Sequence, residues 1–177
     1  MQRLRARNIE FTEDAFWRAL GDRDVQTVED LLDAGLSPTS IDADGMPPLH
    51  VIVMSGCDYG KPTADATRRI VAALLARGAD PNQRDSAGGN PVLHRASSCD
   101  ATLVRQLIAA KADLRAKNAM QLSAFTLFVI GSPDAAAALL DAGYRPDAKE
   151  RVTVKAMHDA ERDPAKRKVL ARALGSK

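Results

Sequence analysis

The sequence predicts an all-α solenoid of helix-turn-helix units joined by β-turn or hairpin loops. Two separate phrases recur along the chain and support this fold. The first is a short polar turn after a Leu-Leu or Leu-Ile pair, and its turn residues are 43, 33 and 32 positions apart, at Gly35, Gly78, Lys111 and Gly143. The second keeps steps of 33, 44, 32 and 32, at Trp17, His50, His94, Thr126 and His158. A step near 33 residues, kept by both phrases, indicates one supersecondary unit stacked on itself.

The second phrase carries a family resemblance. Pro47-Pro48-Leu49-His50 and Pro91-Val92-Leu93-His94 resemble the Thr-Pro-Leu-His-x-Ala motif of ankyrin repeats. From about residue 11 to about residue 174 the chain resembles a short ankyrin-repeat domain of the bacterial type. The resemblance implies that His50, His94 and His158 hydrogen-bond backbone across the turns and connect neighbouring units. Their spacing does not fit a zinc site, and we expect no metal or cofactor.

We expect one domain over residues 1–177. Its repeats are predicted at about 11–42, 43–85, 86–117 and 118–149, with a C-terminal cap at 150–177. Thr12 suits the N-cap of the first helix, and Pro47 and Pro48 suit the start of the third. The last helix is predicted at 164–174.

The ends of the second helices depend on glycine. Gly35, Gly78 and Gly143 follow these helices, where a left-handed residue commonly ends a helix. Lys111 occupies the same position in the third unit, where a left-handed conformation would be strained.

The second unit is about ten residues too long, and the excess lies near residues 55–67. Loops longer than the fold requires are often functional, although lengthening a surface loop also costs little. Tyr59 in this loop is a candidate contact residue, because Tyr offers a large contact area with a polar tip. Cys57 and Cys99 lie at matching corners of neighbouring units, and the sequence leaves their pairing open.

An apolar surface is predicted on the concave face. In ankyrin proteins the residues one and four positions after the motif His, together with the turn tips, point towards a partner. Here that rule selects a largely apolar set around Arg95, and contiguous exposed apolar surface usually marks an interaction site. A competing interpretation is that the apolar fourth unit packs internally. The candidate partner-binding residues are Met46, Val51, Met54, Tyr59, Arg95, Met120, Leu122, Leu127 and Ile130.

Composition favours no catalytic or membrane function. The net charge of +2 makes no case for nucleic acid, and no apolar run is long enough to span a bilayer. The basic N-terminus lacks the apolar stretch of a secretory signal, so we expect a cytoplasmic protein. No phosphate-binding loop, Gly-x-Ser-x-Gly or His-Glu-x-x-His is present, and we expect no enzyme.

The function that fits best is non-catalytic binding of a protein partner. A small inhibitor or immunity-type protein that occludes an enzyme or toxin, and a host-directed adaptor or effector, fit the same features. The identity of the partner and a homodimer through the apolar surface stay open. Nucleic-acid binding by a basic C-terminal helix is a weaker alternative, since stacking aromatics are missing there. Its candidate residues are Arg162, Lys166, Arg167, Lys168 and Arg172.

Overall fold

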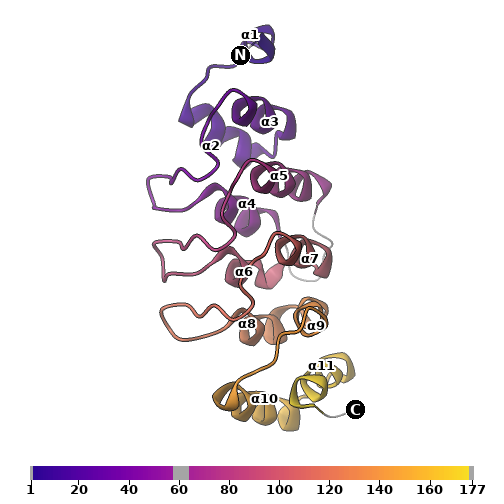
Figure 1. The fold of residues 1–177 in the computed structure, drawn as a ribbon. Helices are drawn as coiled ribbons and strands as arrows, with labels where there is room; N and C mark the ends of the chain where they lie inside the picture. Colours follow the sequence, from indigo (N-terminus) through magenta and orange to yellow (C-terminus); the bar gives the residue numbers. More distant parts are fainter. Residues whose placement is uncertain (1, 58–63, 176–177) are drawn as a thin grey trace.

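The computed structural model describes residues 2–57 and 64–175, and its helices stand in two columns (Figure 1). The first column holds α2 (Glu13–Asp22), α4 (Pro48–Gly56), α6 (Val92–Arg95) with the 3-10 turn η1 (Ala96–Ser98), α8 (Ala124–Gly131) and α10 (Ala148–Ala160). The second column holds α3 (Val25–Asp33), α5 (Asp65–Ala76), α7 (Ala101–Ala109), α9 (Pro133–Asp141) and α11 (Pro164–Leu174). The short α1 (Gln2–Ala6) covers the N-terminal end.

One continuous core joins the units. Leu49, Leu93 and Phe125 each lie two positions after the N-cap of their helix, and all three are buried with Phe16 of α2 in the same hydrophobic cluster. Each helix pair is too thin to bury its apolar face alone, so burial depends on the neighbouring pair. The described residues therefore form the stacked all-α arrangement that the sequence predicts.

Three projecting loops, here called the turn tips, connect the helix pairs on one side of the stack (Figure 1). They comprise residues 42–46, 85–90 and 118–122. Each is closed by a backbone bond between its ends, for example from Asn118 N to Leu122 O at 3.0 Å. The Asn118 side chain also accepts from the backbone N–H groups of Met120 and Leu122. Short polar side chains that bond their own backbone are typical of such turns.

The helix ends predicted from the sequence are confirmed at several positions. Thr12 accepts from Ala15 N at the start of α2, and α11 spans Pro164–Leu174. Gly78 is left-handed, with φ of 95°. Lys111 is left-handed as well, with φ of 70°, so the strain inferred for this residue is present.

The third unit departs from the regular pattern. Its first helix stops after Arg95 and continues as the 3-10 turn η1, which Cys99 closes by donating its backbone N–H to Ala96 O. Cys99 is bonded to Cys57 with an S–S distance of 2.06 Å, which resolves the pairing that the sequence left open. Cys57 is the C-cap of α4. The disulfide therefore joins the second and third units at their helix corners.

We predict that Lys111→Gly stabilises the protein by about 1 kcal/mol, because glycine adopts a positive φ without the steric cost that lysine bears. Urea unfolding followed by circular dichroism measures the change. Lys111→Ala is the matched control and should give no gain, since alanine retains a Cβ. Equal gains from glycine and alanine would show that φ is not the cause.

We predict that reducing the disulfide lowers the free energy of unfolding by about 3–4 kcal/mol. The bond closes a loop with a sequence separation of 42. Opening such a loop raises the conformational entropy of the unfolded chain, which lowers the free energy of the unfolded state by about 3–4 kcal/mol. Guanidinium unfolding with and without dithiothreitol measures the effect, and a Cys57→Ser, Cys99→Ser variant should not respond to the reductant. Unchanged stability in the fully reduced wild type would contradict the prediction.

Candidate partner-binding surface

Two buried histidines connect consecutive units. His50 Nε2 lies 2.8 Å from the carbonyl oxygen of Asn90, and His94 Nε2 lies 3.0 Å from that of Leu122. Because a carbonyl only accepts, Nε2 carries the proton in both rings. Each ring thus holds the turn tip of the following unit against its own helix.

Among the described residues, the second ring nitrogen of these histidines has no hydrogen-bond partner. His50 Nδ1 and His94 Nδ1 are both buried and without a hydrogen bond. The N-cap residue three positions earlier is proline in both helices, Pro47 and Pro91, and proline has no side-chain hydroxyl. In α8 the corresponding Ser123 lies 3.3 Å from the hydroxyl of Thr126. The unpaired nitrogens are therefore a consequence of the proline caps, and they do not indicate a bound metal.

His158 is placed differently, which corrects the alignment made from sequence. It lies in the last turn of α10 and contacts the adjacent Asp159. The N-cap of α10 is Asp147, and the position equivalent to His50 is Glu150. The match of His158 to the motif was wrong because α10 begins after Asp147, earlier than the repeat step from Thr126 implied.

A second buried polar group lies beside the histidines. The Asp85 carboxylate, whose side chain is 0% exposed, pairs with Arg95 Nε at 2.6 Å and accepts from Asn90 N at 3.1 Å. Burial pushes the Asp85 pKa up, but the bonds from Arg95 and Asn90 and the guanidinium charge outweigh it and lower the pKa. Asn118 extends the group to the next tip by donating to the Asn90 side chain at 3.0 Å.

A groove of about 410 Å³ opens between the turn tips and the first column. Arg95 lines it from α6, and Met54 and Leu127 line it from α4 and α8. Met120 lines it from the third tip. The remaining lining residues are Ala87, Asn90, His94, Ser97, Ser98 and Asn118.

The exposure of the apolar candidates varies. Met120 is 73% exposed, Ile130 63% and Met54 47%. Val51, Leu122 and Leu127 are half-buried. Met54, Met120 and Leu127 line the groove, whereas Val51, Leu122 and Ile130 are not among its lining residues.

Two candidate partner-binding residues differ from the prediction, and a third cannot be assessed. Met46 is buried rather than exposed, because its tip folds back with the Met46 backbone N–H bonded to Asp42. Arg95 lines the groove, but its Nε and one of its Nη atoms bond inward to Asp85 and Ala87 O, so it also supports the tip. Tyr59 lies outside the described residues.

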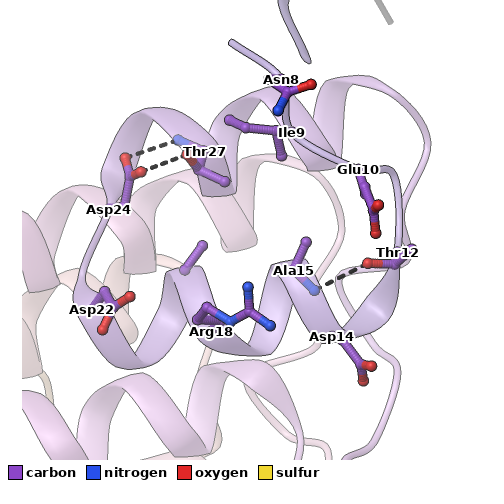
Figure 2. A pocket seen from close by; sticks show the side chains of 11 residues that line it. Asn8, Ile9, Glu10, Thr12, Asp14, Ala15, Arg18, Asp22, Asp24 and Thr27 are labelled. Carbon is purple, nitrogen blue, oxygen red and sulfur yellow. Dashed lines mark hydrogen bonds between the residues drawn. The ribbon is translucent and has the colours of Figure 1, made fainter. Parts of the chain in front are cut away.

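A larger hollow, of about 510 Å³, lies at the N-terminal end between α2, α3 and the segment after α1. Figure 2 shows Arg18 rising from α2 into it, with Asp22 and Asp14 on either side. Glu10 and Asp24 add two further carboxylates to its lining. Sequence reasoning did not identify this hollow, because it forms where α1 folds over the first unit.

Nothing in the described part of the chain resembles a metal centre or a membrane span. No group of three or more His, Cys, Asp or Glu residues there could hold a metal ion. None of the helices described is long and apolar enough to cross a bilayer.

The family model for the ankyrin repeat matches residues 44–86, which contain α4, α5 and the first two residues of the second tip. Residues 44–86 are therefore similar to an ankyrin repeat, and helix pairs of the same kind stack on both sides of this segment. No curated protein matches the chain. Ankyrin repeats are in general modules for protein–protein interaction and are generally non-enzymatic.

We predict that Arg95→Ala destabilises the fold by about 3 kcal/mol, because it leaves the Asp85 carboxylate buried without its counter-charge. Chemical unfolding measures the loss. The double variant Asp85→Asn, Arg95→Ala removes both charges and should recover a large part of it. If the double variant is no more stable than Arg95→Ala, the ion pair does not have this role.

We predict that stability falls as the pH drops from about 7 to 5. Burial lowers the pKa of His50 and His94 below 6.5, against the opposing effect of their backbone partners. In this window the unfolded state therefore binds more protons than the native state, and the free energy of unfolding decreases as the pH falls. Urea titrations at several pH values measure the slope. A His50→Gln, His94→Gln variant should have a shallower slope, and an equal slope would rule out these rings as its source.

Proposed function

We propose that this chain is a non-catalytic module that binds a protein partner across its groove and turn tips, over the second to fourth units. The observation that carries the proposal is the groove itself, which the exposed Met54 and Met120 line together with the half-buried Leu127. Four other large apolar side chains are exposed among the described residues but do not line it: Phe11, Ile41, Ile130 and Val152. Apolar side chains that stay exposed at a groove are typical of an interaction site, and flexible methionines suit an adaptable one.

The expected interface is of ordinary size. It would bury on the order of 1,200–2,000 Å² in total, with a few central side chains contributing most of the affinity. Both an inhibitor that occludes an enzyme or toxin and an adaptor or effector would use this surface, and its chemistry is the same in either role.

Nucleic-acid binding by the terminal helix has less support. Arg172 is paired with Asp141, and Lys166 donates to the carbonyl oxygen of Ile130 at 3.4 Å. Two of the five cations predicted for this role are thus engaged with the protein. A gel-shift experiment at low salt tests the alternative, since phosphate contacts are strongest there.

The binding proposal predicts that Met120→Asp with Leu127→Asp reduces partner capture at least about ten-fold while leaving the stability within about 1 kcal/mol, because both side chains keep solvent contact. Arg95 is left unchanged because it supports the tip. Affinity capture from the native cell with quantitative mass spectrometry measures the loss. Ala72→Asp, on the exposed side of α5, is the matched control. Equal capture by the two variants would place the binding surface elsewhere.

A further inference from the structure

The surface around the groove has a charge order along the stack. Residues 10–24, around α2, contain five Asp and Glu against two Arg. The helices α4, α6 and α8 and the turn η1 contain no acidic residue, and Arg95 is their single Lys or Arg. Residues 148–175, around α10 and α11, contain eight Lys and Arg against four Asp and Glu. The first column thus runs from an acidic α2 segment through an apolar middle to a basic end. Residues 2–9 add three Arg at the first end, where Arg3 and Arg7 pair with Asp30 of α3 and Arg7 also pairs with Asp24.

Contacts bring the two charged ends to the borders of the apolar surface. At the first end, α2 packs against α4, and the side chain that crosses between them is the basic Arg23, which donates to the carbonyl oxygen of Ser55. At the basic end, Lys166 donates to the carbonyl oxygen of Ile130, and Ile130 is one of the most exposed apolar residues. The α2 segment and the α10–α11 segment therefore flank the apolar helices on both sides.

Building on the proposed function, we propose that the partner contributes one amphipathic segment with three blocks: a basic end over α2, an apolar centre over the groove, and an acidic end over α10 and α11. Charge complementarity favours this order, because a partner charge of the wrong sign at either end would be repelled. The basic block would meet Asp14 and Asp22 beside Arg18, and the acidic block would meet Lys166 and Arg162.

The length of the segment follows from the stack. Packed helices lie ~10 Å apart, so the four steps from α2 to α10 span about 40 Å. A helix that covers this distance has about 27 residues, and its apolar centre, over the two steps from α4 to α8, has about 13. A second copy of this chain also presents an acidic and a basic end, so self-association is an outcome that the test must separate.

The test uses the full-length protein and four labelled synthetic helical peptides of about 27 residues, with fluorescence anisotropy as the readout. All four share the same number of Leu residues. One has a Lys end, a Leu centre and a Glu end, and a second has these same residues scrambled. The other two have the Leu centre with two Glu ends or two Lys ends. Reversing the block order is no control, because the peptide can bind in either backbone direction.

We expect the block peptide to bind at least about ten-fold tighter than any of the other three at low salt, with the advantage shrinking as salt is added. In Arg162→Glu, Lys166→Glu the preference should move to the peptide with two Lys ends. Arg105→Glu, an exposed residue of α7 away from the groove, is the control and should keep the wild-type preference.

The outcomes separate the two proposals. If all peptides with a Leu centre bind alike, the charge order is wrong and the apolar binding surface stands. If the block peptide does not bind, the inference is overturned. Partner capture by the Met120→Asp, Leu127→Asp variant then shows whether the groove is still the binding surface. A dimer seen by light scattering that persists with saturating block peptide would also overturn it and favour a second copy as the occupant.

Discussion

The hydrogen bond from a buried imidazole to the carbonyl of the next turn tip is the interaction on which the other features of this molecule depend. His50 and His94 lie inside one unit and bond to Asn90 and Leu122 of the next. Apolar contact between helix pairs is non-directional and would tolerate small rotations of one unit against another. The directional bonds fix the second and third tips relative to the helices before them, and so fix the width of the groove.

The groove is therefore a product of polar chemistry beneath it. Asp85 holds Arg95 against the second tip, and Asn118 connects that tip to the third. The apolar side chains of Met54, Met120 and Leu127 stand on this polar support without taking part in it. This division explains why removing the charge of Arg95 tests folding, whereas adding a charge at Met120 tests binding.

The sequence predicted the repeated architecture because the constraints that create it are local. A left-handed helix end favours glycine, as at Gly78, and a helix start tolerates proline, as at Pro48. Both residue types therefore recur in the sequence at the repeat period. The strain at Lys111 was foreseen for the same reason. His158 was misplaced because a motif residue has meaning only at a fixed distance from a helix start, and the start of α10 at Asp147 was not identified.

The candidate surface was predicted less completely. The position of a residue along its helix correctly predicted that Met54 and Ile130 are exposed. It predicted neither the inward ion pair of Arg95 nor the burial of Met46. Those depend on how the tips fold over the helices, which is a long-range property. The hollow in front of Arg18 was not predicted either, because one of its walls is the segment after α1, whose position depends on long-range packing.

Native-state hydrogen exchange on His94→Ala tests the central claim most directly. If the imidazole bond couples the units, removing it should raise the exchange rates of the amides in α8–α11 relative to those in α2–α5, because the C-terminal units can then open separately. In the wild type the two groups should differ less. Protection lost uniformly over all helices, or not at all, would contradict the account.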